Sequence, residues 1–107
     1  MIISTTGRIE GRDITDTLGF VSGQVIRPVP RPRQGETVIP PSPAIVEDVM
    51  KTAEAEALSR LRDAAAQIGA HAITGMTISY DMIDPHFGTI LCSARGTAVV
   101  LKDIKHR

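Results

Sequence analysis

A long helical pattern ends at a glycine and passes within three residues into a strand pattern. Between residues 44 and 68, apolar side chains recur at intervals of three and four, the spacing of one helix face. Ser42 can cap the first turn, Pro43 suits the first helical position, and Gly69 supplies the stop. At about 1.5 Å per residue this helix would be roughly 37 Å long. We therefore expect part of its apolar face to meet another subunit.

Four other segments have the composition of strands, at residues 2–6, 15–26, 71–81 and 89–101. Apolar and polar residues alternate poorly in the second segment, which indicates a strand covered on both faces. Glycines within that segment mark a close backbone approach or a bulge; they are Gly19 and Gly23. The segments together predict an α+β fold in which a small antiparallel sheet packs on one long helix.

The last two strand segments predict a hairpin with two different faces. Side chains alternate between the two faces of a strand. In residues 71–81 the even-numbered residues are predicted to face the core: Ala72, Thr74, Met76, Ile78 and Tyr80. In residues 89–101 the matching parity is Ile90, Cys92, Ala94, Gly96, Ala98 and Val100. The odd-numbered residues of both segments are rich in hydroxyl groups. Their face of the hairpin is not needed for packing on the helix and is available for binding. In the expected register Gly75 lies opposite Arg95 and needs its missing side chain.

Residues 27–43 interrupt the strand pattern. They hold six of the seven prolines and three arginines, so no regular helix or strand is expected and the segment is predicted to be a surface loop. The arginines are interpreted as solvated, with anion binding as the alternative. The prolines at the end of the loop are interpreted as a connector, with a peptide-ligand role as the alternative.

Length and charge narrow the function classes. A chain of 107 residues predicts a single domain over 1–107, which packing against copies of itself would stabilise. Twelve basic and twelve acidic residues give a net charge of zero, which argues against nucleic acid and anionic membranes as partners. Cys92 is the single cysteine, and no signal peptide or membrane span is recognisable, so a cytoplasmic location is expected.

Four short motifs occur in a fixed order along nearly the whole chain: Ser4-Thr5-Thr6, residues 19–23, Gly69-Ala70-His71-Ala72-Ile73, and residues 93–99. In this order, with a helix between the second and third motifs, the chain resembles the YbjQ-like family, often labelled a "putative heavy-metal-binding domain". The resemblance implies a small YbjQ-like or dodecin-like subunit that closes into a homo-oligomeric ring of five copies. It also implies a divalent transition metal as the cofactor. This chain departs from the family pattern in its proline-rich loop and at His71, where an acidic residue is common.

Candidate metal ligands are few. No paired cysteines or histidines have metal-ligand spacing, and the nearest cluster is Asp81, Asp84 and His86, within six residues of one loop. Mixed carboxylate and imidazole ligands would suit zinc, nickel or copper. Ordinary turn residues are the competing interpretation. Cys92 lies among the apolar alternate residues of its strand and is interpreted as a core residue. His71 follows the helix and is interpreted as a cation that interacts with the helix C-terminus.

A ring would bring copies of one residue together around its axis, so a site needs no cluster within one chain. Arg95 and Thr97 on the hydroxyl-rich face are the candidate ligand-binding residues for a lined channel, with Arg95 as the anion contact. A paired surface arginine is the alternative. Because no catalytic motif is recognisable, the sequence predicts a non-enzymatic, homo-oligomeric binding protein. The alternatives are a small-molecule-binding or storage ring and an enzyme with sites between subunits.

Overall fold

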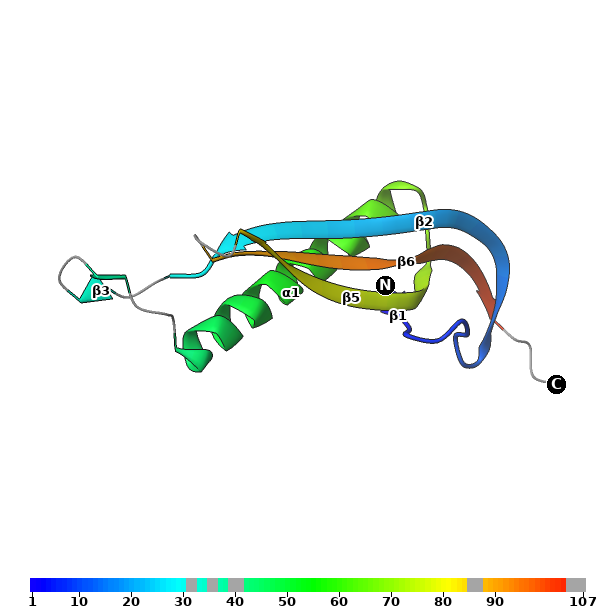
Figure 1. Cartoon of the computed structure of the whole chain (residues 1–107). Coiled ribbons are helices and arrows are strands. Elements are labelled where there is room, and N and C mark those ends of the chain that lie inside the picture. Colours follow the sequence, from blue (N-terminus) through cyan, green and yellow to red (C-terminus); the bar gives the residue numbers. More distant parts are fainter. Residues whose placement is uncertain (31–32, 35–36, 39–41, 85–87, 104–107) are drawn as a thin grey trace.

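The computed structural model describes residues 1–30, 33–34, 37–38, 42–84 and 88–103, and only the backbone at 33–34, 37–38, 83–84 and 103. Figure 1 shows two layers, a twisted sheet and one helix that crosses a single face of it. The elements in chain order are β1 (Ile2–Ile3), β2 (Arg12–Pro28), β3 (Arg33–Gln34), β4 (Thr37–Val38), α1 (Pro43–Gln67), β5 (Ala72–Asp84) and β6 (Thr89–Asp103).

The sheet is mixed, with strand order β1-β5-β6-β2. The three long strands pair antiparallel, as expected, but β1 pairs in parallel with the start of β5. β1 is also shorter than the predicted strand at 2–6. The residues after β1 make three further backbone bonds to the edge of β5 without extending the strand. The Ser4 amide donates to the Ile73 carbonyl, and the amides of Met76 and Gly75 donate to the carbonyls of Ser4 and Thr6.

The proline-rich segment is more regular than expected. β2 continues to Pro28, and the two-residue strands β3 and β4 pair antiparallel. Pro28 is tolerated because it ends an edge strand, where a missing N–H costs no bond to a second neighbour. The expectation that no strand forms within 27–43 is therefore wrong at these positions. Pro40 and Pro41, interpreted from the sequence as part of a connector with a peptide-ligand role as the alternative, lie outside the described residues.

Both helix ends form as the sequence predicts. The Ser42 hydroxyl accepts a hydrogen bond from the Ile45 amide at 3.3 Å, and Pro43 opens the helix. At the other end the amides of Gly69 and Ala70 donate to the carbonyls of Ala66 and Ala65. This pair of bonds is a Schellman motif, and Gly69 permits it because its φ is 79°.

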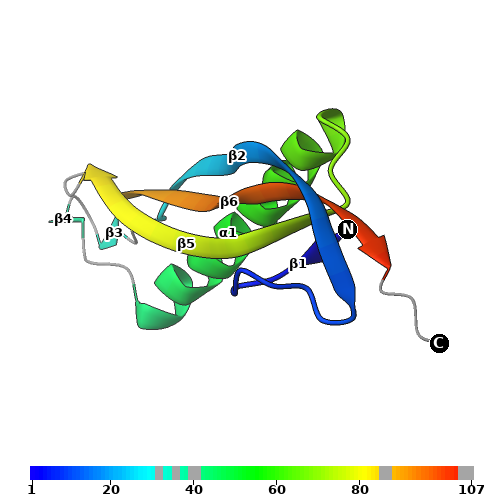
Figure 2. The same ribbon diagram turned by 90° about the vertical axis from the view of Figure 1, so that its right-hand side faces the viewer.

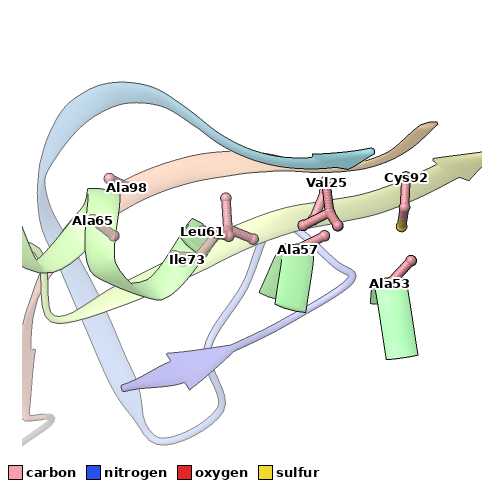
Figure 3. Packing of buried hydrophobic residues seen from close by; sticks show 9 residues of the cluster. Val25, Ala53, Ala57, Leu61, Ala65, Ile73, Cys92 and Ala98 are labelled. Carbon is pink, nitrogen blue, oxygen red and sulfur yellow. The ribbon is translucent and has the colours of Figure 1, made fainter. Parts of the chain in front are cut away.

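Small residues bring the helix close to the sheet. A stripe with one residue per helical turn is completely buried and consists of Ala53, Ala57, Leu61 and Ala65. Figure 3 shows this stripe facing Val25, Ile73, Cys92 and Ala98 of the sheet. Gly23 of β2 makes the closest approach, since a Cβ there would lie 2.3 Å from the Ala57 carbonyl oxygen. The predicted close approach at Gly23 is thus confirmed.

Polar contacts flank this core on both sides of the helix. Toward β2, Arg27 forms an ion pair with Glu56, and Arg60 donates to the Gln24 carbonyl at 2.6 Å. Toward β5, the Tyr80 hydroxyl donates to Glu54 at 2.7 Å. These contacts fix the orientation of α1 on the sheet, although each partly exposed pair contributes little to stability.

A β-bulge at Gly75 changes which residues of β5 face the helix. Thr74 pairs with Thr97 and Thr77 pairs with Arg95, so two residues of β5 lie opposite one residue of β6. After the bulge Met76 and Ile78 pack on the helix side, as predicted. Before the bulge the odd-numbered residues face the helix instead, because Ile73 belongs to the helix-side core. The prediction is therefore wrong for Ala72, which lies in the second cluster, and Gly75 is not opposite Arg95.

Gly75 is needed for its backbone conformation. Its φ is 60°, and a Cβ there would meet no heavy atom within 4 Å, so overpacking is not the cause. We expect Gly75→Val to lower the free energy of unfolding by about 1 to 2 kcal/mol, because a β-branched residue is strained in this region. Asparagine tolerates the conformation, so Gly75→Asn should cost less than half as much. Urea denaturation of both variants checks this, and equal stability of the two would contradict it.

A second, smaller core closes the other end of the sheet. Ile9 packs there with Ala72, Val99 and Leu101 on the face opposite the helix. Bulges in β2 near Ile14 and near Gly19 let the strand curl toward the N-terminal segment, as Figure 2 shows. The predicted bulge at Gly19, whose φ is 129°, is confirmed.

Candidate ligand site on the uncovered face of the sheet

The face of the sheet opposite the helix is uncovered along its centre. Within the described residues, the N-terminal segment packs only on one end of this face, through Ile9. β2 therefore buries one face, contrary to the expectation that both are covered, and its alternate side chains from Phe20 to Ile26 are exposed. Phe20 is 93% exposed and Ile26 is 60% exposed. β2 thus carries large apolar side chains on both faces, and the described part of the chain covers one of them.

A hollow of about 300 Å³ lies on this uncovered face. It spans the three long strands, and its lining comprises Phe20, Gly75, Thr77, Arg95, Gly96 and Thr97. The strand register explains the grouping, because Phe20 pairs with Thr97 on β6 while Thr77 of β5 pairs with Arg95. Both predicted ligand residues, Arg95 and Thr97, thus line the same hollow.

Sequence reasoning did not identify Phe20 as a neighbour of these residues. The long-range pairing of β2 with β6 places it there, and two bulges in β2 set that pairing. One signal was present in the sequence. Phe20 is one of only two phenylalanines, and it lies in a strand segment that has apolar residues at both odd and even positions, and so on both faces.

The predicted metal ligands are only partly described. Asp81 is exposed on β5 opposite Leu91, and the backbone of Asp84 pairs with Thr89 near the end of the same strand. His86 lies outside the described residues. Over the part of the chain that the structure describes, no three histidine, cysteine, aspartate or glutamate side chains are close enough to hold a metal ion. Asp84 belongs to a strand rather than to the expected loop.

Cys92 is a buried residue of the main core, on the predicted parity, beneath α1. Burial raises the pKa of the Cys92 thiol, and the Glu54 carboxylate adds to this effect. Desolvation raises the pKa of the Tyr80 hydroxyl on the neighbouring strand, and its hydrogen bond to Glu54 raises it further. Both groups are therefore held in their neutral forms, which gives a thiol unsuited to nucleophilic attack or metal binding.

The raised thiol pKa predicts a loss of stability at alkaline pH. Because the folded state holds the proton more tightly, the unfolded state loses it first as the pH rises past about 8.5. The free energy of unfolding should therefore fall from about pH 8.5 upward, and the fall should be shallower in Cys92→Ala. Urea denaturation between pH 7 and 10 measures this. A fall that is as steep in the variant would show that Cys92 has no part in it.

His71 contacts the neighbouring strand. Its Nδ1 accepts a hydrogen bond from the Leu101 amide at 3.1 Å and lies 3.2 Å from the Leu101 carbonyl oxygen. These contacts join His71 to β6, and they leave the predicted cation at the helix C-terminus untested.

Comparison with known proteins identifies the family. The family model described as "Putative heavy-metal-binding" matches residues 41–102, more than half of the chain. A UPF0145 protein of Halalkalibacterium halodurans is 34% identical over 106 residues, with 95% of this chain and 97% of the relative covered. A UPF0145 protein of Actinobacillus pleuropneumoniae is 33% identical, with 95% and 100% covered.

The chain belongs to the YbjQ family.

A solved structure has the same fold. This crystal structure, of a protein of unknown function from Pediococcus pentosaceus assigned to the DUF74 family, is 14% identical, with a TM-score of 0.67. It covers 95% of this chain and 98% of its own chain. The predicted family and the α+β fold are thus confirmed. Among the residues that the structure describes, no helix has the length and apolar character needed to span a membrane.

Proposed function

We propose that this YbjQ-family chain is a non-enzymatic binding protein that works as a homo-oligomeric ring of five copies, using the uncovered face of its sheet to hold small ligands. The observation that carries the proposal is that face, which combines a strongly exposed Phe20 with the Arg95 hollow. The number five comes from the resemblance to the YbjQ-like family. A cytoplasmic location is part of the proposal, supported by the free thiol of Cys92.

The accessible surface supports self-association. Large apolar side chains contribute to the exposed surface at both ends of the sheet, among them Ile14, Leu18, Ile26 and Met82. Contact with a second copy would remove such groups from water, which is a favourable change.

The sheet edges also support it. Among the described residues, no strand pairs with the outer edge of β2, and the outer edge of β5 is bonded only near its start, by β1 and by Ser4 and Thr6. From Phe20 to Ile26 the β2 edge carries no charge, no proline and no bulge. Edges of this kind pair readily with another chain, and natural proteins seldom leave them free. We therefore expect a neighbouring copy to cover this edge.

Hydrogen exchange at the β2 edge tests this assembly. In a lone subunit, alternate amides from Phe20 to Ile26 would point to solvent and exchange fast, because β6 bonds only the others. In the ring we expect every amide in this stretch to be protected, since the neighbouring copy accepts the outward bonds. Fast exchange at alternate positions at micromolar concentration would contradict the proposal.

Metal binding is a second candidate function, favoured by the family's description as "Putative heavy-metal-binding". The candidate ligands remain Asp81, Asp84 and His86, which are close in sequence and of types that suit zinc or copper. We expect affinity to fall below about pH 6, where the imidazole takes up a proton.

The test is calorimetric titration of zinc and of copper into the wild type and into the double variant Asp84→Ala/His86→Ala. Loss of binding in the variant is the expected result. Equal affinity in both proteins would exclude this cluster as the site. Absence of binding in the wild type would contradict metal binding by this chain.

A further inference from the structure

The hollow on the uncovered face has a floor of backbone and walls of side chains. Its floor is the backbone at Gly75 and Gly96. A Cβ on Gly96 would point to the other side of the sheet, toward Ile73 in the helix-side core. Neither glycine is easily replaced. Gly75 has a φ of 60°, and a Cβ on Gly96 would lie 2.4 Å from a methyl carbon of Ile73. The hollow is thus a consequence of the bulge and is part of the fold.

Arg95 supplies the charge of the hollow. It is exposed, and it makes no ion pair or hydrogen bond to any residue in the described part of the chain. The five other lining residues carry no charge, so nothing in the hollow neutralises the guanidinium. Its planar fork of N–H donors suits an anionic group that accepts two parallel hydrogen bonds.

Phe20 supplies a flat apolar surface beside that charge. It pairs with Thr97, and Arg95 is two residues further along β6, so the two side chains are diagonal neighbours about 7 to 8 Å apart. A single ring can lie over Phe20 while a group attached to that ring reaches the guanidinium. The hydroxyls of Thr77 and Thr97 flank the same space and can donate to the ligand.

We propose that this hollow binds a planar aromatic ring carrying one anionic group, with the ring against Phe20 and the anion on Arg95. The inference rests on the binding function proposed above and names the ligand class for it. The volume of about 300 Å³ lies at the lower end of small-molecule pockets, which suits a one-ring ligand. Carboxylate and phosphate share the required chemistry, and the experiment distinguishes them.

Ligand-observed saturation-transfer NMR on the full chain measures this binding with four probes. Benzoate and phenyl phosphate carry the ring and the anion. Cyclohexanecarboxylate keeps the charge but is not planar, and benzamide keeps the ring but is neutral. We expect one or both aromatic anions to bind, and both comparison probes to bind at least several-fold more weakly. Equal binding of all four, or of none, would overturn the inference.

Variants locate the site. Arg95→Gln should weaken benzoate or phenyl phosphate about tenfold or more, since a hydrogen bond to a charged group is lost. Phe20→Leu should weaken it about three- to tenfold, because the apolar contact is kept but the aromatic face is lost. Arg62→Gln removes the same charge from an exposed position on α1 and should leave affinity unchanged. Equal losses in Arg95→Gln and Arg62→Gln would mean non-specific attraction and would overturn the inference.

Native mass measured on the same samples separates this inference from the proposed assembly. Binding through Arg95 by a monomer would support the ligand class and contradict the ring. A ring that binds none of the probes would contradict the ligand class alone. If Phe20→Leu changes the number of subunits and not the affinity, Phe20 is a contact between copies and the inference is wrong.

Discussion

Gly23→Ala is expected to lower the free energy of unfolding by about 3 kcal/mol, at the upper end of the usual cost of overpacking. The added Cβ would lie 2.3 Å from the Ala57 carbonyl oxygen and 2.5 Å from the Leu61 amide nitrogen. Both atoms belong to the helix backbone, so no side-chain rotation can relieve the contact. The helix must move away from β2, which loosens the packing of the whole stripe.

Urea denaturation at a fixed protein concentration measures this loss, because the stability of an oligomer depends on concentration. Gly7→Ala is the matched control, since a Cβ at Gly7 meets nothing within 4 Å. It should change stability by no more than about 0.5 kcal/mol. A Gly23→Ala protein as stable as the control would show that the helix does not approach the sheet this closely.

Leu61→Ala should destabilise the chain by about 3 kcal/mol, within the usual range for a buried leucine. Leu61 has no exposed surface and is one of the largest fully buried side chains in the described part of the chain. Its neighbours in the stripe are alanines, so little can move in to fill the cavity. Leu58→Ala is the control because Leu58 is only partly buried at the margin of the same cluster.

Denaturation of the two leucine variants under identical conditions gives the comparison. We expect the loss in Leu58→Ala to be about half of that in Leu61→Ala, because less apolar surface leaves the interior. Equal losses would contradict the position of the stripe, since they would place both side chains equally deep in the core.

Local signals made the helix predictable from sequence. Ser42, Pro43 and Gly69 each act on backbone groups within a few residues, so the cap, the first turn and the stop do not depend on the rest of the fold. The bulge at Gly75 was not predictable in the same way. A strand glycine is compatible with several conformations, and only the pairing of β5 with β6 shows that one residue is inserted there. Because of that insertion, the residues of β5 before Gly75 face the side of the sheet opposite to the one predicted.

The candidate site was predictable where it depends on one strand. Alternation along β6 places Arg95 and Thr97 on the face away from the helix. Phe20 and Thr77 join them through long-range register, which sequence patterns do not specify when bulges are present. The parallel pairing of β1 was missed for a similar reason, since two residues carry too little pattern to determine a direction.

The stoichiometry of the native particle tests the proposed assembly most directly, because copies of Arg95 can line a common channel only if the subunits form a ring. Native mass spectrometry of the full chain at micromolar concentration measures it directly. We expect a species of five copies, about 57.5 kDa, with any retained ligand visible as added mass. A spectrum dominated by the 11.5 kDa monomer would contradict the proposed assembly.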